Sequence, residues 1–436
     1  MAVHPIDYRY GSREMREIFE EETRLQLMLD VEAALSRAHA DLNHIPKEAA
    51  EEISKKANTR IVKIERVKEI EEETKHDIMA MVKALAEKCK YGGYVHLGAT
   101  SNDINDTATA LQFKMALNIV LKDLEELKEI LKRLTEENID RVCIGRTHGQ
   151  HSIPTTYGMK LGIFLDETKR NIERIKRAKE NIRGKMSGAV GTMASFDDGI
   201  NIQKLVGKYL NIKMAEISNQ IVQRDIYAEI ICSLAILAST LDKIALEIRN
   251  LQRTEIMEIA EAFGKKQVGS STMPHKRNPI TSEKICGLAR VIYSNVFPAL
   301  LNNPLWHERD LTNSSCERVI IPETFVLIDE MLKGMKKTLE NIVFYPENIE
   351  KNLELLRGRN MAEAVMIKLV KKGYDRQKAH ELLRIIAQKE GDFKENLIKN
   401  ETVRKYLTER EIEEALNPER YIGSAVEIVR GILKED

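Results

Sequence analysis

Apolar residues along this chain recur at the spacings of helices, and breaks in the pattern are few. The segment from Lys208 to Phe263 contains no glycine or proline. Within it, spacings of four and three alternate between the apolar residues Ile230, Leu234, Leu237, Leu241, Ile244, Ile248 and Leu251. This spacing places one apolar stripe along a long helix. We therefore predict a long bundle helix here.

A second segment without glycine or proline runs from Ala99 to Ile144. Its apolar stripe consists of Leu117, Leu121, Leu124, Leu127, Leu131 and Leu134. The pattern predicts a second long helix, which could lie beside the first. Uncovered stripes of this length would leave a large apolar surface in water, so we also expect copies of the chain to associate through a helical bundle.

No segment shows the sustained two-residue alternation of strands, so we predict an all-α fold. The breaks divide it into three helical domains: an N-terminal domain at 1–98, a central long-helix bundle with the catalytic loop at 99–346, and a C-terminal domain at 347–436. In the last domain, apolar spacings before and after Gly373 predict two short amphipathic helices.

Charge and cysteine content exclude several classes of protein. The 68 basic and 68 acidic residues give a net charge of zero, which removes a strong electrostatic case for binding nucleic acid or an anionic membrane. No apolar run reaches the roughly 18 residues of a membrane span, and the N-terminus lacks a signal core. We expect a soluble, cytoplasmic protein. Five scattered cysteines without a C-x-x-C pair argue against disulfides and a zinc cluster.

Three polar islands interrupt the helical pattern. The first, from Val95 to Asp106, contains His96, Thr100, Ser101 and Asp103. Its spacing favours a plain helix N-terminus, with Thr100 or Ser101 as the cap and Asp103 in the first turn. The same geometry would supply donors for a substrate carboxylate or phosphate.

The second island, from Gly145 to Pro154, contains His148 and His151. No carboxylate or cysteine nearby completes a metal site, so a metal is disfavoured. A histidine beside Gly149 could approach a substrate closely and act as a general acid, because its pKa lies near neutrality. A structural histidine in a turn is the alternative that spacing leaves open.

The third island, Gly269 to Pro279, combines two serines with His275, Lys276, Arg277 and Asn278. It is typical of a mobile, anion-binding loop. A serine acts as a base only where cations and N–H donors stabilise its alkoxide, and this loop carries both. The G-x-x-x-x-G-K-[ST] and G-x-G-x-x-G patterns of phosphate loops are absent.

The third island resembles the G-S-S-x-M-P-x-K-x-N-P loop of the fumarase/aspartase superfamily, and the other two islands resemble its companion motifs in the same order. His275, Thr74 to Asp77, Arg9-Tyr10 and Thr147 to Gln150 resemble the branch that acts on succinylated purine nucleotides. The resemblance implies a homotetramer with a shared central bundle, active sites built from several subunits, release of fumarate from purine nucleotide substrates, and no metal or organic cofactor.

The resemblance also implies residue roles. Ser270 would abstract the Cβ proton of the succinyl group, Lys276 and Asn278 would stabilise the resulting carbanion, and His148 would protonate the departing nitrogen. His76 would lie beside His148, and Glu283 would orient His148 or its neighbours. Substrate binding would fall to Arg9, Tyr10, Lys75, Asp77, His96, Thr100, Ser101, Thr147, Gln220, Ser271, Arg277, Asn278, Arg309, Ser314 and Arg318.

Two alternatives compete with this interpretation. One is another lyase on the same scaffold, notably 3-carboxymuconate cycloisomerase, against which the Thr-Lys-His-Asp and Arg-Tyr marks argue. The other is a catalytically inactive structural homologue of the crystallin type. Intact Ser270, His148 and Lys276 disfavour it.

Overall fold

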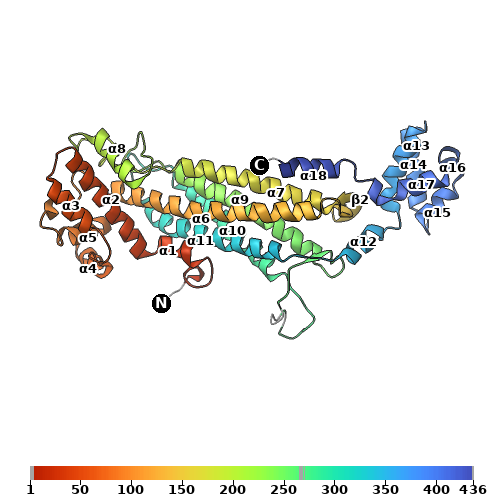
Figure 1. The fold of residues 1–436 in the computed structure, drawn as a ribbon, viewed down its shortest axis with the longest axis horizontal. Helices are drawn as coiled ribbons and strands as arrows, with labels where there is room; N and C mark the ends of the chain where they lie inside the picture. The colour runs from red at the N-terminus through yellow and green to blue at the C-terminus, as the bar shows by residue number, and fades with distance from the viewer. Residues whose placement is uncertain (1–3, 265–268, 270, 435–436) are drawn as a thin grey trace. The chain divides into compact units, whose positions relative to one another are not determined.

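Helices dominate the chain, which confirms the all-α prediction. The computed structural model describes residues 4–264, 269 and 271–434, and 66% of it is helical (Figure 1). It comprises two compact units: unit 1 is formed by residues 1–125, 171–241 and 287–333, and unit 2 by residues 126–170, 242–286 and 334–436. The division into domains at 1–98, 99–346 and 347–436 stays a prediction.

Five long helices each contribute residues to both units. They are α6 (Ser101–Glu137), α7 (Tyr157–Glu180), α9 (Asp225–Leu251), α10 (Ile280–Leu301) and α11 (Thr312–Glu340).

The remaining elements are shorter. Unit 1 adds η1 (Pro5–Asp7), α1 (Arg13–Phe19), α2 (Glu21–Asp41), α3 (Lys47–Lys56), α4 (Ile64–Thr74), α5 (Asp77–Ala86), η2 (Gly92–Tyr94) and α8 (Gly199–Leu210). Unit 2 adds the strands β1 (Val142–Thr147), β2 (Gln150–Thr156), β3 (Ile259–Ala260) and β4 (Val343–Phe344). It also contains α12 (Pro346–Glu354), η3 (Arg359–Met361), α13 (Ala362–Lys371), α14 (Arg376–Ala387), α15 (Phe393–Ile398), α16 (Glu401–Tyr406), α17 (Glu409–Leu416), η4 (Pro418–Arg420) and α18 (Ala425–Lys434).

Both predicted apolar stripes are buried. All seven stripe residues of α9 are at most 3% exposed, and so are all those of α6 except the half-buried Leu121 and Leu134 at 4%. The second helix is shorter than its glycine-free segment, because α6 ends at Glu137 and the β-branched and small apolar residues from Val142 onward pair with β2.

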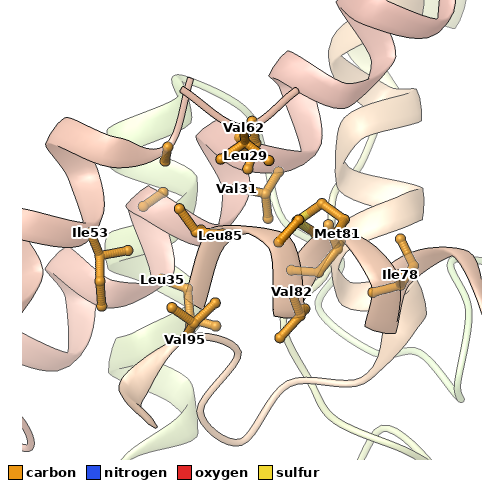
Figure 2. Packing of buried hydrophobic residues seen from close by; sticks show 14 of the residues in the cluster. Leu29, Val31, Leu35, Ile53, Val62, Ile78, Met81, Val82, Leu85 and Val95 are labelled. Carbon is orange, nitrogen blue, oxygen red and sulfur yellow. The ribbon is translucent and has the colours of Figure 1, made fainter. Parts of the chain in front are cut away.

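The core of unit 1 lies between α2 and the short helices around it. Leu29 and Leu35 of α2 meet Met81 and Leu85 of α5, with Ile53 of α3 at the edge of the cluster (Figure 2). α2 also packs against α8, and α4 packs against α5. Val95 and Ile104 of the first polar island belong to this core, which therefore anchors the island.

The C-terminal part of unit 2 has its own core. The two predicted amphipathic helices are α13 and α14, and their apolar faces meet α15 and α17 through residues such as Val365, Leu383 and Phe393. Met361 lies just outside, in η3. Two small antiparallel sheets, β1–β2 and β3–β4, complete the strands among the described residues, in agreement with the expectation of no large sheet.

Among the described helices, α10 alone is long and apolar enough to cross a membrane by length and composition. A core helix of a soluble protein passes the same test. Ile285, Ala289 and Ile292 of α10 are buried against protein, and 39% of its apolar window is buried in all.

We predict that Leu29→Ala lowers the free energy of unfolding by about 2–5 kcal/mol, because the methyl groups it removes leave a cavity in a fully buried site. Denaturant-induced unfolding followed by circular dichroism measures the change. Leu355→Ala, at a residue that is 60% exposed, serves as the control and should change the free energy by less than about 0.5 kcal/mol. Equal effects of both variants would contradict the described core.

Candidate active site

The predicted site residues fall into two sets, one in each unit. Unit 1 contains the residues of the first island with Arg9, Tyr10, His76, Gln220, Arg309, Ser314 and Arg318. Unit 2 contains the hairpin of the second island and the loop of the third. Each set is described on its own below.

In unit 1, the start of α5 joins the starts of α6 and α11. His76 is the N-cap of α5, where its Nδ1 accepts a hydrogen bond from the backbone of Met79, and its Nε2 lies 3.5 Å from Oγ of Ser101. The Asp77 carboxylate accepts a hydrogen bond from Arg318 at 3.1 Å. Four predicted binding or catalytic residues are therefore brought together.

A buried ion pair fixes the start of α6. The carboxylate of Asp103 and the ammonium of Lys185 are both 0% exposed and in direct contact. The same carboxylate accepts hydrogen bonds from the backbone N–H groups of Thr100, Ser187 and Gly188. Asp103 lies in the first turn of α6, as predicted, and accepts the hydrogen bond from Thr100, but its main partner is a lysine that sequence patterns did not identify.

A second buried group, Arg224, holds the start of α11. Its guanidinium makes two hydrogen bonds of 2.9 Å to Asp106 and two, of 2.7 and 3.2 Å, to Glu317. Nearby, Arg309 donates to the side chain of Gln220 at 3.1 Å. Gln220 and Arg309, both predicted as binding residues, are therefore hydrogen-bonded to each other, and sequence reasoning missed Arg224 and its partners.

These residues line a cavity of about 490 Å³, which we call the arginine-lined cavity after Arg24, Arg224, Arg309 and Arg318. Ser314 and Asp77 also line it. Arg24 was not predicted. It donates to the amide oxygens of Asn105 and Gln112, and burial together with the charge of Arg318 lowers its pKa. The cavity thus presents an arginine hydrogen-bonded to neutral amide groups.

His96 does not line this cavity and instead contacts the buried residue Glu32. Its Nδ1 is 2.6 Å from the fully buried carboxylate of Glu32, which also accepts from the His96 backbone N–H. Burial disfavours the charged ring, but the hydrogen bond and charge of Glu32, with the charge of Asp103, outweigh it and raise the pKa of His96. This geometry indicates a structural ion pair.

The other predicted residues of unit 1 lie at its surface. Arg9 is exposed and Tyr10 half-buried, in a segment anchored where the backbone of Gly11 and Ser12 donates to Glu330 and Asp329 of α11. Lys75 ends α4 in the left-handed conformation. Lys75 precedes the cavity-lining residue Asp77 by two positions, and Tyr10 precedes the cavity-lining residue Phe19 by nine.

In unit 2, the second island forms a hairpin. Thr147 pairs with Gln150, and the two turn residues both have positive φ, 53° for His148 and 75° for Gly149. This is the conformation of a two-residue turn of the I′ type, which glycine adopts readily and histidine adopts more often than most residues. The sequence analysis left a turn open as one alternative and did not predict the strands on either side of it. His148 is exposed at its tip.

A buried carboxylate supports the hairpin. Glu258 is 0% exposed and accepts hydrogen bonds from Arg146 of β1, Tyr157 of α7 and Asn352 of α12 at 2.5, 2.6 and 3.0 Å. These bonds fix the base of the strands that lead to His148. Since Glu258 follows no motif, nothing in the sequence pattern pointed to it.

The third island closes on itself. Ser270 lies outside the described residues. Beside it, the Asn278 amide donates to the carbonyl of Gly269 at 2.9 Å, and a Cβ at Gly269 would lie only 1.8 Å from the Lys276 carbonyl oxygen. Gly269 is therefore required for the closure. Ser271, Lys276 and Arg277 are exposed.

Two side chains attach this loop to the helices on either side. Gln252, at the end of α9, donates to the Arg277 carbonyl at 3.2 Å and accepts from the Glu261 backbone. The Glu261 carboxylate in turn accepts from the backbone N–H groups of Thr281 and Ser282 and caps α10. Glu283 lies in the first turn of α10 and is exposed.

No group of three His, Cys, Asp or Glu side chains within the described part of the chain is arranged to hold a metal ion. The absence of a metal or cofactor stays a prediction.

We predict that His96→Asn destabilises the protein more at about pH 6 than at about pH 9, with a deficit of about 1–3 kcal/mol at the lower pH. The folded-state pKa of His96 exceeds its unfolded value of about 6.5, so the stabilisation is complete below that value and is lost as pH rises through the folded-state pKa. Asparagine tolerates the positive φ of this position. Denaturant titrations at both pH values test it, and a deficit that grows with pH would contradict the ion pair.

The chain resembles known lyases over nearly its whole length. A family described as "Lyase" matches residues 8–294, and one described as "Adenylosuccinate lyase C-terminus" matches residues 358–432. The adenylosuccinate lyase of Pyrococcus abyssi is 64% identical over 99% of this chain and 98% of that protein, and that of Pyrococcus horikoshii is 62% identical over 100% and 98%.

Solved structures share the fold at lower identity. A fumarate lyase from Mesorhizobium sp. BNC1 superposes with a TM-score of 0.90 at 29% identity, over 98% of both chains. The 3-carboxy-cis,cis-muconate lactonizing enzyme of Pseudomonas putida also gives 0.90 at 29% identity, over 99% of this chain and 98% of that one. The fold is thus common to several lyases, whereas sequence identity separates them. On that identity, the chain belongs to the adenylosuccinate lyase family of the fumarase/aspartase superfamily.

Proposed function

We propose that the chain releases fumarate from adenylosuccinate, giving AMP, and from succinylaminoimidazole carboxamide ribotide, giving AICAR, in purine biosynthesis. The observation that carries the proposal is identity of 64% and 62%, over nearly full length, with relatives named adenylosuccinate lyase. The cycloisomerase alternative is supported by a much lower sequence identity, 29% with the lactonizing enzyme of Pseudomonas putida. Conversion of adenylosuccinate by the pure protein, followed by purine absorbance, tests the proposal directly.

The reaction breaks the bond between nitrogen and Cα of the succinyl group. In the proposed mechanism, Ser270 removes a Cβ proton and the electron pair becomes the double bond of fumarate. Lys276 stabilises the negative charge that develops on the adjacent carboxylate. His148 donates a proton to the departing nitrogen, a role worth about 10²–10⁴ in rate.

Local geometry supports these roles. The I′ turn holds His148 outward at the hairpin tip, where a substrate can reach it. Closure of the loop through Asn278 and Gly269 holds Lys276 within a short, constrained segment. An amide has two N–H groups, so Asn278 can close the loop with one and bind a substrate carboxylate with the other. Glu283 is proposed to orient His148.

The residues of unit 1 are proposed to hold the rest of the substrate. Arg318, Ser314 and Arg309 line the arginine-lined cavity and suit a phosphate, because planar guanidinium groups donate paired hydrogen bonds to such anions. His76 is proposed to lie beside His148 and the substrate phosphate, and Ser101, which lies 3.5 Å from His76, to bind the substrate with it. The remaining proposed binding residues are Arg9, Tyr10, Lys75, Asp77, His96, Thr100, Thr147, Gln220, Ser271 and Arg277. Because His96 is paired with Glu32, we propose that it acts on the substrate only indirectly.

We further propose a cytoplasmic homotetramer whose active sites combine residues of several copies. An exposed apolar face of α10 supports association: Tyr293, Phe297, Leu300 and Leu301 recur at helical spacing and are 37–69% exposed. A chain that carried this surface alone in water would be prone to aggregate. No nucleic acid, membrane, metal or organic cofactor is required by the proposed reaction.

We predict that Ser270→Ala and His148→Asn each lower kcat by at least about 100-fold, because each removes a group that transfers a proton. Asparagine is chosen because it tolerates the positive φ of residue 148. The measurements are initial rates with adenylosuccinate and circular dichroism to verify folding. Ser424→Ala and His380→Gln, at exposed positions in the C-terminal part, are matched controls with near-normal rates. Normal turnover by either catalytic variant would refute its role.

We also predict that mixing Ser270→Ala and His148→Asn subunits restores part of the activity. If the two residues of one site come from different copies, a mixed tetramer contains some sites that are intact at both positions. The test is turnover after denaturation and refolding of the mixture, with subunit exchange verified by mass spectrometry of the native assembly. Verified exchange without recovery would show that both residues of a site come from one copy.

A further inference from the structure

Unit 1 contains a second, larger cavity, of about 980 Å³, between α6, α7 and the α8 region. We call it the lysine-lined cavity. Its described lining includes none of the proposed catalytic or substrate-binding residues.

Backbone hydrogen bonds hold the floor of this cavity in place without a ligand. The segments around Gly184 and Met214 form a parallel bridge, with bonds of 2.9 and 2.8 Å from Gly184 N to Lys213 O and from Ala215 N to Gly184 O. Gln203 of α8 fastens both segments through Met186 N and Ala215 O. A ligand entering here would meet a preformed wall, as in most small-molecule sites.

The charge of the lining is one-sided. Six lysines and two glutamates line the cavity, an excess of four positive charges in a chain whose net charge is zero. The lysines are Lys114, Lys176, Lys179, Lys204, Lys208 and Lys213. Lys204 and Lys208 are four residues apart on α8 and therefore share a face. Within the described chain, no carboxylate lies within ion-pair distance of Lys204, Lys208 or Lys213.

The remaining lining is apolar. Leu121, Ile182, Met193 and Met214 contribute aliphatic and thioether surface, and thioethers make favourable contacts with aromatic rings. An apolar wall beside unneutralised lysines fits a ligand that combines a flat ring system with a strongly anionic part.

We propose that the lysine-lined cavity binds a nucleoside triphosphate, separate from the nucleotide monophosphates of the proposed reaction. The base lies on the methionine and aliphatic side chains, and the phosphates contact the lysines of α8 and Lys213. The strongly anionic polyphosphate of a nucleoside triphosphate suits Lys204, Lys208 and Lys213, which have no carboxylate partner among the described residues, whereas Lys176 is already paired with Glu125 and Glu173. The enzyme would thereby bind a second class of nucleotide at a site of its own.

Isothermal titration calorimetry with ATP tests the proposal on the full-length protein, in EDTA and with AMP present at a concentration that saturates the catalytic site. We expect one ATP per chain. The triple variant K204Q/K208Q/K213Q should bind at least about tenfold more weakly, since charge-assisted contacts are lost. All three lysines are exposed, so the fold is retained.

The matched control is K371Q/K389Q/K405Q, which removes the same charge at exposed positions of the C-terminal part and should bind ATP like the unmodified chain. Inorganic tripolyphosphate should bind more weakly than ATP, because it lacks the base. The proposal is overturned by absence of ATP binding beside AMP, by equal affinities of the two triple variants, or by tripolyphosphate binding as tightly as ATP. Because turnover is not measured, failure here leaves the proposed lyase function untouched.

Discussion

The fully buried contact between Asp103 and Lys185 is the constraint around which unit 1 is organised. Removing one partner of such a pair typically costs about 3–5 kcal/mol, because the other charge is left without compensation in a dry site. The pair is therefore formed only when the chain around residue 185 lies against α6. The hydroxyl of Thr107, which exchanges hydrogen bonds with the Lys185 backbone, holds the same register.

Two sites depend on that register. On one side, the Asp103 carboxylate fixes the backbone of Thr100 and so the direction in which Ser101 leaves the helix start. On the other side, the chain that follows Ile182 continues into the Gly184 bridge, which forms the floor of the lysine-lined cavity. The Asp103–Lys185 ion pair thus holds two backbone segments in place, one beside the proposed substrate-binding residues and one beside the proposed triphosphate site.

The helices could be predicted from the sequence because their buried residues recur periodically. The stripe residues of α9 all lie on one buried face, and their spacing of three and four residues is visible in the sequence. It did not reveal buried charges. Lys185, Arg224 and Glu258 have partners 82, 118 and 101 to 112 residues away in the chain, and no local pattern encodes such pairings. The His148 hairpin was missed for a related reason, since β1 and β2 are too short and irregular to show alternation. The roles carried over from the motif loop remain predictions, with Ser270 outside the described residues.

The hairpin has a consequence for how the family can vary. Its register shifts between Ile144 and Arg146, where β2 carries one residue more than β1, and it regains alignment in time for the two-residue turn. Adding or deleting one residue in either strand would turn every following side chain to the opposite face of the ribbon. His148 would then be displaced even though it was still present in the sequence. The number of residues between Val142 and Thr156 therefore determines where His148 lies, and we expect this segment to tolerate an exchange of side chains more easily than a change of length.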